Sequence, residues 1–506
     1  MKKKHPFFIL LFIFLTLTVN AQALKVATIF SDHMVLQREK TVPVWGTSKP
    51  LDEITVQFAG QTQKTKTTAE GKWMVKLAPL KTSFDGQDMV ISGQNKVVVK
   101  DILVGEVWIC SGQSNMQMGV SSSVEVRGLV PLAQNIRSFQ VAEKVSLVEQ
   151  EQIEGQWKTT NPPSAVAFSF AYFLRNLGQV PVGIIQTSWG SSSIEAWMPR
   201  SMTQELPHFN TIMNEFDADA ARVAQIEKVM AKSNWTNDEN IYLRRQPNIL
   251  YNAMMHPLIP FACRGVVWYQ GERNTRSISG MPEVDKENWF HRVCGMKEYG
   301  TVLQKWMLNY RKQWQDDQLH FMVVMLPGYG KGTEKKMNID PESPTEESWS
   351  WMRESQLDAL SLPHVSVVNT IDLGDEKNIH PTDKLPIGQR AALLAAANTL
   401  QLKKTAIGPT LKKVVEEKGK LVVHFNQAEG LKTTNGKAPS GFWVANDEKK
   451  WVKADTKIQG ETVVLSAAEV QNPKYVRYAF AGKPTVNLVN NSELPAYPFR
   501  TDNWEE

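Results

Sequence analysis

Ser114 is the residue of this sequence best placed to act as a nucleophile. It stands in residues 110–116 (CSGQSNM), directly after an apolar stretch. Gly112 permits a sharp turn, and a serine that opens a helix gains from the free N–H groups there. Gly, Ser and Asn also form ordinary turns, and the run departs from the G-x-S-x-G pattern. Ser114 therefore needs partners elsewhere in the chain: a base and donors for an oxyanion.

Such partners follow other apolar stretches. His380 is the preferred base because it comes after the last predicted strand and before a predicted helix. His256 competes with it, but no polar cluster follows a strand there. Gly190 offers a backbone N–H and Gln270 a side-chain amide. With the N–H of Ser114, these two groups would form an oxyanion hole, so the set predicts acyl-transfer chemistry.

The elements that position these residues alternate between strand and helix. Continuous apolar runs predict strands at 104–110, 180–186, 265–269, 321–326 and 365–371. Helical patterns lie at 165–177, 218–232, 301–313 and 387–400. This alternation predicts a doubly wound α/β core around a parallel sheet. The chemistry of such a core lies at the carboxyl ends of its strands.

Period-two alternation predicts β-rich domains on both sides of this core. We expect the first over residues 24–100 and the second over 406–506, with the catalytic domain at 101–405 and a helical insertion around 200–260.

Residues 1–23 have the pattern of a secretory signal peptide: three lysines, an apolar stretch over 7–17 and small residues at the end. That stretch is shorter than the ~20 residues that span a bilayer. We therefore expect an exported protein, periplasmic or secreted, that does not associate with the membrane after its leader is removed.

Charge and cysteine content exclude several classes of function. The net charge is +5, of which three charges are leader lysines, leaving +2 with both signs interspersed. This balance does not suggest nucleic-acid binding. Cys110, Cys263 and Cys294 are too few for a disulfide framework, although export would permit one disulfide. No metal-binding motif is present, so we expect neither metal nor cofactor.

Five segments together resemble the sialate O-acetylesterase family of SGNH hydrolases. They are residues 29–38, 112–116, 268–274, 379–381 and 492–504, in the order that the family has them. The resemblance implies an SGNH-type three-layer αβα core flanked by β-rich domains. It also implies that O-acetylated sugars are the substrates, with sialic acid the family's namesake.

The resemblance further implies roles for individual residues. Ser114 would be the nucleophile and His380 the general base, with Ser114, Gly190 and Gln270 as oxyanion donors. The residues expected to contact the sugar belong to the same segments: Gln113, Asn115, Glu272 and Asn274.

The group that orients His380 is open. SGNH enzymes often have an aspartate three residues before the histidine, where this sequence has Lys377. We favour Asp375 as the third catalytic residue, then Asp372. Asn378, or a Ser-His dyad aided by backbone carbonyls, are the alternatives.

Two other functions compete with a sialate 9-O-acetylesterase. One is the same reaction on another glycan, such as acetylated xylan or pectin; the other is a glycan-binding protein without activity. Glu195, Trp197 and Arg353 would either line the sugar site or serve as packing and ion-pair residues. No segment indicates an oligomeric state.

Overall fold

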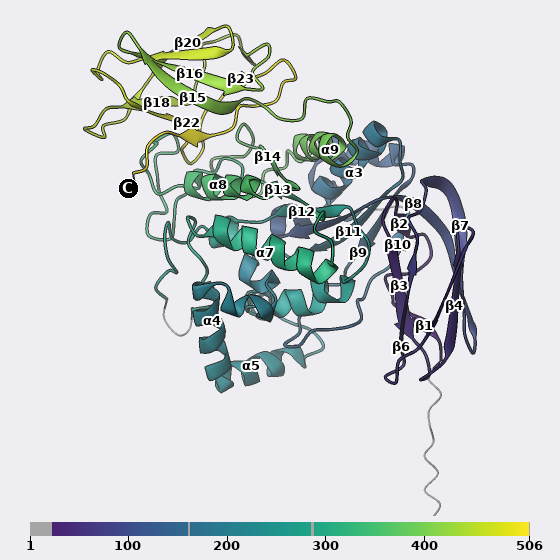
Figure 1. Ribbon diagram of the computed structural model, residues 1–506. Helices are drawn as coiled ribbons and strands as arrows, with labels where there is room; N and C mark the ends of the chain where they lie inside the picture. Colours follow the sequence, from purple (N-terminus) through teal and green to yellow (C-terminus); the bar gives the residue numbers. More distant parts are fainter. Residues whose placement is uncertain (1–22, 160–161, 285–287, 505–506) are drawn as a thin grey trace, which may run out of the picture.

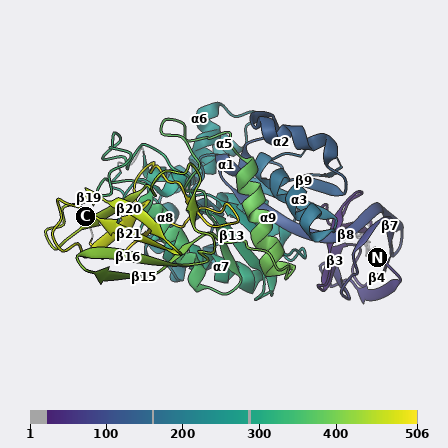
Figure 2. The ribbon, with the colours of Figure 1, turned by 90° about the horizontal axis from the view of Figure 1, so that it is seen from above.

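The computed structural model describes residues 23–159, 162–284 and 288–504 (Figure 1). The predicted leader, apart from its last residue, lies outside the described residues. Figure 2 shows an α/β core between two groups of strands, the N-terminal group at one end and the C-terminal group at the other. This arrangement confirms the predicted fold class.

The core is a sheet in which strands run parallel in the order β9-β11-β8-β12-β13-β14, with β10 antiparallel beside β9. From β8 the chain builds one half of the sheet and then crosses to the other, so a topological switch point lies at the end of β8. The strands are β8 (Lys96–Gly112), β9 (Ile136–Gln140), β10 (Trp157–Lys158), β11 (Val182–Ser188), β12 (Gly265–Tyr269), β13 (His320–Val324) and β14 (Val365–Val368).

All five predicted core strands are present. Residues 265–269 match β12 at both ends, and the other four differ by some residues at one or both ends. Strand β9 was not predicted, because its sequence IRSFQ contains no continuous apolar run. Arg137 of β9 is buried nonetheless, since its guanidinium binds the Asp101 carboxylate at 2.9 Å.

Helices cover both faces of this sheet. Trp108 of β8 packs against Phe170 of α3, whereas Trp268 of β12 packs against Trp306 of α7. Trp108 pairs in register with Gly265, three residues before Trp268. Because side chains alternate between faces, the two tryptophans lie on opposite faces of the sheet. The result is a three-layer αβα core.

The four predicted helices correspond to α3, α5, α7 and α9, and further helices occur between them. Helices α4, α5 and α6 occupy the region predicted as a helical insertion, and Figure 1 shows α4 and α5 beside the core. The helices are α1 (Ser114–Gln117), α2 (Val124–Leu129), α3 (Ala165–Gly178), α4 (Pro207–Ala218), α5 (Ala220–Met230), α6 (Asn237–Arg244), α7 (Tyr299–Trp314), α8 (Ser350–Leu357) and α9 (Leu385–Thr399).

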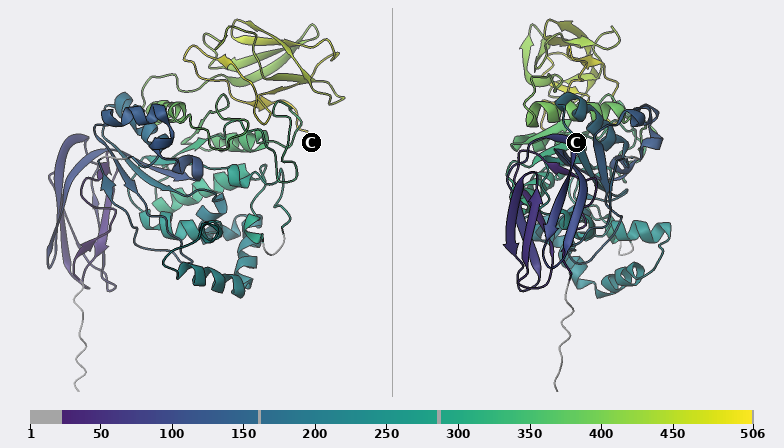
Figure 3. Two further views of the ribbon diagram at one scale, coloured as in Figure 1. Left: turned by 180° about the vertical axis from the view of Figure 1, so that it is seen from behind. Right: turned by 90° about the vertical axis from the view of Figure 1, so that its right-hand side faces the viewer.

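Most N-terminal strands form two antiparallel groups, while β2 pairs parallel with β8 (Figure 3, purple). One is β1-β3-β6; in the other, β4 pairs with β5 and β7, and β7 pairs with the first half of β8. Strand β8 thus runs through the predicted domain boundary at residue 100 into the core sheet. The strands are β1 (Lys25–Val26), β2 (Val35–Gln37), β3 (Val42–Thr47), β4 (Glu53–Phe58), β5 (Gln61–Lys66), β6 (Lys72–Leu77) and β7 (Ser83–Ser92).

The C-terminal strands form small antiparallel sheets above α8 and α9 in Figure 1. The sheets are β15-β16-β21-β20, β19-β18-β22-β24 and the pair β17-β23. The strands are β15 (Thr410–Glu417), β16 (Lys420–Asn426), β17 (Lys432–Thr433), β18 (Phe442–Ala445), β19 (Val452–Lys453), β20 (Asp455–Gln459), β21 (Thr462–Ser466), β22 (Tyr475–Tyr478), β23 (Leu488–Val489) and β24 (Phe499–Arg500).

The expectations about cysteines and membrane-spanning helices can also be compared with the structure. The three cysteines are buried and unpaired. Within residues 23–159, 162–284 and 288–504, no helix has the length and apolar character needed to cross a membrane.

Candidate active site

Ser114 lies at the carboxyl end of the central strand β8, where it opens the single-turn helix α1. Gly112 has a φ of +134°, and a Cβ there would lie 2.1 Å from the carbonyl oxygen of Tyr269 on β12. Glycine is therefore required at this turn. As the first residue of α1, Ser114 has a backbone N–H without an intrahelical acceptor.

His380 reaches Ser114 from the segment between β14 and α9. Its Nε2 lies 2.8 Å from Ser114 Oγ. Burial, and then the positive charge of Lys384, lower the pKa of His380. The imidazole is therefore neutral near pH 7, which is the state in which Nε2 can accept the serine proton.

Asp375 was expected to orient His380, but in the structure its carboxylate does not contact the imidazole. The Asp375 carboxylate instead accepts the backbone N–H groups of Lys377 and Asn378, both at 2.7 Å, because a loop aspartate readily caps its own turn. Asp372 is also engaged, in a two-bond ion pair with Arg390.

Asn378 binds the backbone of His380, not its ring. Its Oδ1 accepts the backbone N–H of His380 at 2.9 Å. No residue in the described part of the chain hydrogen-bonds His380 Nδ1, so the structure places Ser114 and His380 together as a pair.

The backbone N–H of Gly190 lies beside the nucleophile. A Cβ at Gly190 would be 3.3 Å from Ser114 Cβ, so the missing side chain permits this close approach. The Gly190 N–H donates to Gln117 Oε1 at 2.7 Å. Gln117 must therefore release Gly190 before that N–H can bind an oxyanion.

Gln270 does not supply the third oxyanion donor that was expected. Its side chain is fully buried, and its Nε2 donates to Asn274 Oδ1 at 2.9 Å. Further contacts at 3.2 Å reach Gln113 Oε1 and the Ser192 carbonyl. These acceptors occupy the donors of Gln270, which binds the surrounding loops together.

Ser114 and His380 open into a cavity of about 440 Å³. Its lining contains four arginines and one carboxylate: Arg244, Arg245, Arg273, Arg276 and Glu272. The remaining lining residues are mainly polar: Gln113, Gln117, Gly190, Ser191 and Ile379. The cavity next to the dyad is therefore strongly cationic.

Residues 230–395 match the family model of carbohydrate esterases described as sialic acid-specific acetylesterase. Sialate O-acetylesterase of Mus musculus is 28% identical over 534 residues, covering 94% of this chain and 93% of its own length. The human enzyme is 26% identical over 524 residues, covering 94% and 91%. The crystal structure of a carbohydrate acetylesterase from Xanthomonas citri is 30% identical, covers 95% of this chain and 100% of its own, and gives a TM-score of 0.78.

The chain belongs to the sialate O-acetylesterase family of carbohydrate esterases. This confirms the resemblance inferred from the five sequence segments and makes the protein a carbohydrate esterase.

The residues expected to contact the sugar divide into two pairs in this esterase. Gln113 and Glu272 line the cavity. Asn115 and Asn274 do not: they are 1% and 0% exposed, and their side chains are held in internal hydrogen bonds. All four residues follow the ends of core strands and therefore lie near the site, but this position does not determine where each side chain points.

Glu195, Trp197 and Arg353 serve as structural residues of the esterase. Trp197 is fully buried, and its carbonyl accepts the Tyr310 hydroxyl at 2.8 Å. Arg353 is also fully buried and donates to backbone carbonyls that include those of Pro327 and Gly482.

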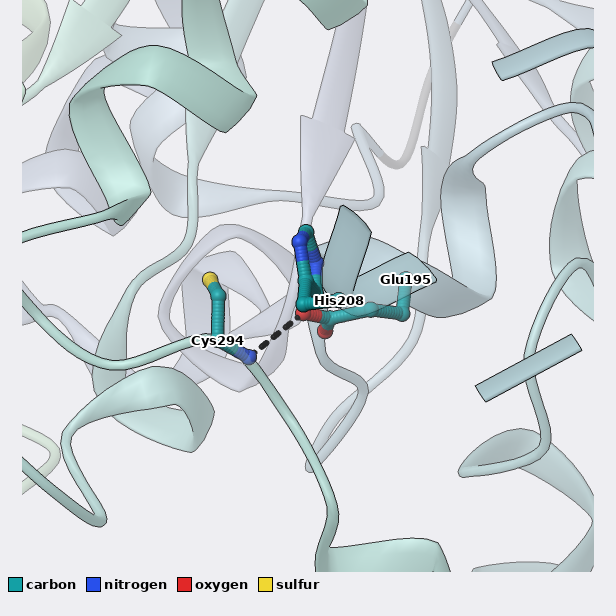
Figure 4. A group of neighbouring side chains, drawn as sticks. All are labelled: Glu195, His208 and Cys294. Carbon is teal, nitrogen blue, oxygen red and sulfur yellow. Dashed lines mark hydrogen bonds and ion pairs between the residues drawn. The ribbon is translucent and has the colours of Figure 1, made fainter. Parts of the chain in front are cut away.

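Glu195 belongs to a buried group with metal-ligand chemistry. In the described part of the chain, the ligand atoms of Glu195, His208 and Cys294 lie within 4.8 Å of one another (Figure 4). The Glu195 carboxylate already accepts the Cys294 backbone N–H at 2.9 Å and the Asn274 amide at 3.1 Å.

The thiol of this group is poorly suited to a metal. Burial and then the charge of Glu195 raise the pKa of Cys294, which disfavours the thiolate that binds metals. We interpret the group as internal hydrogen bonding that holds the loops beneath the cavity.

The arginines of the cavity were not anticipated from sequence. Arg244 and Arg245 lie at the end of α6, which a capping box of Thr236 and Glu239 begins. Arg273 and Arg276 follow β12, where only the neighbouring Gln270, Glu272 and Asn274 had been considered. The S/T-x-x-E pattern at 236–239 would have indicated α6, but not that its end faces Ser114.

Proposed function

We propose that this carbohydrate esterase removes O-acetyl groups from sialic acids, most directly 9-O-acetylated ones. The chemistry rests on the Ser114–His380 pair, with Oγ and Nε2 separated by 2.8 Å. The choice of sugar rests on one observation, the arginine cluster beside that pair.

The reaction proceeds through an acetyl-enzyme. Ser114 Oγ attacks the acetyl carbonyl carbon while His380 Nε2 takes its proton, and the N–H groups of Ser114 and Gly190 bind the resulting oxyanion. The sugar oxygen then leaves with the proton from His380. Water, deprotonated by the same imidazole, attacks the acetyl-enzyme and releases acetate and free Ser114.

The arginine cluster favours an anionic sugar. Arg276 pairs with Glu334, but Arg245 and Arg273 form no ion pair with a carboxylate in the described part of the chain. Arg245 donates instead to the Ser191 hydroxyl, at 2.6 and 3.1 Å.

The electrostatics of the arginine cluster also favour an anionic sugar. Burial, and then neighbouring arginines, lower the pKa of both Arg245 and Arg273. A bound carboxylate would relieve this repulsion and match the guanidinium geometry. Sialic acid carries such a carboxylate on the same sugar residue as its acetyl esters, whereas a xylan backbone is neutral.

The direct test is acetate release from three substrates at matched acetyl content: 9-O-acetylated sialoglycan, acetylxylan and acetylated pectin. We expect the highest kcat/KM on the sialoglycan. A preference for acetylxylan would contradict the role of the arginines. A preference for pectin would retain an acidic sugar but replace sialic acid with a uronic acid.

Arg245→Gln tests the cluster itself. Because a charge-assisted hydrogen bond contributes about 1.5–3 kcal/mol, we expect KM for sialoglycan to rise about 10- to 100-fold. Hydrolysis of a small neutral acetyl ester should stay within about twofold. Arg127→Gln, on the exposed face of α2, is the matched control that should change neither. An equal loss on both substrates would contradict carboxylate recognition.

A further inference from the structure

Asn115 links the two catalytic segments through a single buried side chain. It follows Ser114 in the chain, and its Nδ2 donates at 3.0 Å to the carbonyl of Ile379, the residue before His380. Asn115 is 1% exposed. A hydrogen bond therefore connects the immediate neighbours of the nucleophile and the base.

Two buried charges fix the orientation of this amide. Lys384 Nζ donates to Asn115 Oδ1 at 2.6 Å, and Asn115 Nδ2 donates to Glu272 Oε1 at 2.5 Å. A lysine ammonium can only donate, so it must face the amide oxygen, which directs Nδ2 toward Ile379. Lys384 is fully buried and Glu272 is 7% exposed.

The His380 segment needs such an anchor. Residues 369–384, between β14 and α9, contain no strand or helix in the structure. The usual restraint, a carboxylate on Nδ1, is missing in the described part of the chain. Lys384 lies four residues after His380 and Ile379 directly before it, so the Asn115 contacts hold the segment on both sides of the base.

We propose that Asn115, oriented by Lys384 and Glu272, is a positioning residue that sets the Ser114–His380 geometry in place of a triad aspartate. The proposal rests on the proposed roles of Ser114 and His380. Asn115 touches neither substrate nor the reacting atoms. It acts by holding the backbone that carries the imidazole.

The first test is the steady-state kinetics of Asn115→Ala and Lys384→Met on a small neutral acetyl ester. Misplacement by about 1 Å costs about 10²-fold, so we expect kcat to fall about that much while KM changes less than about twofold. Covalent labelling of Ser114 by a serine-directed phosphonate should slow by a similar factor.

The double variant Asn115→Ala/Lys384→Met tests whether the two residues act as one unit. Lys384 also lowers the pKa of His380, so the comparison is made at a pH where His380 is neutral in every variant. There we expect the double variant to be no slower than Asn115→Ala alone, because Lys384 acts on the geometry of the pair through Asn115. Losses that multiply would contradict this coupling.

Asn309→Ala is the matched structural control. Asn309 is a buried asparagine of α7 with two side-chain hydrogen bonds, to Ser201 and Gln313, outside the cavity. We expect a comparable drop in Tm with kcat unchanged. If Asn115→Ala also lowers only Tm, the positioning role is overturned.

Failure of this proposal is distinguishable from failure of the proposed function. Undiminished activity in Ser114→Ala would contradict the proposed catalytic role of the Ser114–His380 pair. If Ser114→Ala is inactive but folded Asn115→Ala keeps a normal kcat, only the positioning role is contradicted. Should Asn115→Ala fail to fold, Lys384→Met, which keeps Asn115, provides the same kinetic test.

Discussion

The Ser114 hydroxyl and the His380 imidazole contact each other at 2.8 Å. Within residues 23–159, 162–284 and 288–504, no carboxylate hydrogen-bonds the far side of the imidazole. A triad aspartate stabilises the imidazolium that forms as the serine proton moves, so a dyad must rely on position and on a suitable base pKa.

Ser114→Ala and Asp375→Asn separate a dyad from a triad. We expect Ser114→Ala to lose about 10⁴-fold or more in kcat. Asp375→Asn should stay within about threefold, because an asparagine oxygen can still accept the turn N–H groups that Asp375 now accepts. A loss near 10⁴-fold in Asp375→Asn would show that this carboxylate contacts His380 during turnover.

The pH dependence of kcat/KM reports the base. Only neutral His380 accepts the serine proton, so activity is complete above its pKa and is lost as pH falls through it. Burial and Lys384 lower the pKa of His380, so the acid limb should have its midpoint below the ordinary value of about 6.5. The profile is measured on a neutral acetyl ester, and a midpoint at or above that value contradicts the prediction.

The position of Ser114 depends on the tight turn by which strand β8 passes into helix α1. The turn between β8 and α1 passes through Gly112, whose backbone packs directly on β12. Its left-handed φ and its lack of a side chain serve one purpose, which is to bring Ser114 out over the end of the sheet.

Gly112→Ala should displace that turn. An added Cβ would lie 2.1 Å from the Tyr269 carbonyl, so we expect kcat to fall about 10²-fold and Tm to fall as well. Gly128→Ala is the matched control, because Gly128 lies in α2 with open space around it. Alanine there should raise Tm slightly, since glycine costs up to about 1 kcal/mol in a helix. Equal behaviour of the two variants would contradict the strict requirement at Gly112.

The sequence predicted the positions of strands and helices better than the directions in which side chains point. Apolar runs predicted β12 at both ends. Ser114, Gly190 and His380, chosen because they follow strands, all line one cavity. Gln270 was chosen in the same way but is buried, because a strand end fixes a position along the sheet and not whether the side chain faces the cavity or the interior. Arg245 was missed because its proximity to Ser114 comes from the packing of α6, a long-range contact without a local pattern.

At the scale of the whole molecule, the N-terminal strands and the core are joined by buried charge as well as by chain continuity. Glu106 of β8 is fully buried and binds Arg38, after β2, at 2.7 Å. It also binds Arg264, before β12, at 2.8 and 2.9 Å. One carboxylate thus connects the N-terminal segment to the core sheet.

Glu106→Gln should therefore destabilise the whole chain. Removing one partner of a buried ion pair typically costs about 3–5 kcal/mol, which chemical denaturation would measure. Glu53→Gln is the matched control, because Glu53 and Lys66 form an exposed pair that contributes about 1 kcal/mol or less. Similar losses in the two variants would contradict the structural role of Glu106.

The length of strand β8 affects how precisely Ser114 is aligned. Its seventeen residues pair with β7 at one end and with β11 and β12 at the other, and they end two positions before Ser114. A slip of one residue in strand pairing turns every side chain to the opposite face. Because both sheets share this strand, such a slip would have to break the pairing in both at once. The N-terminal sheet thus holds the strand that leads to Ser114 in register, although none of its strands lines the cavity.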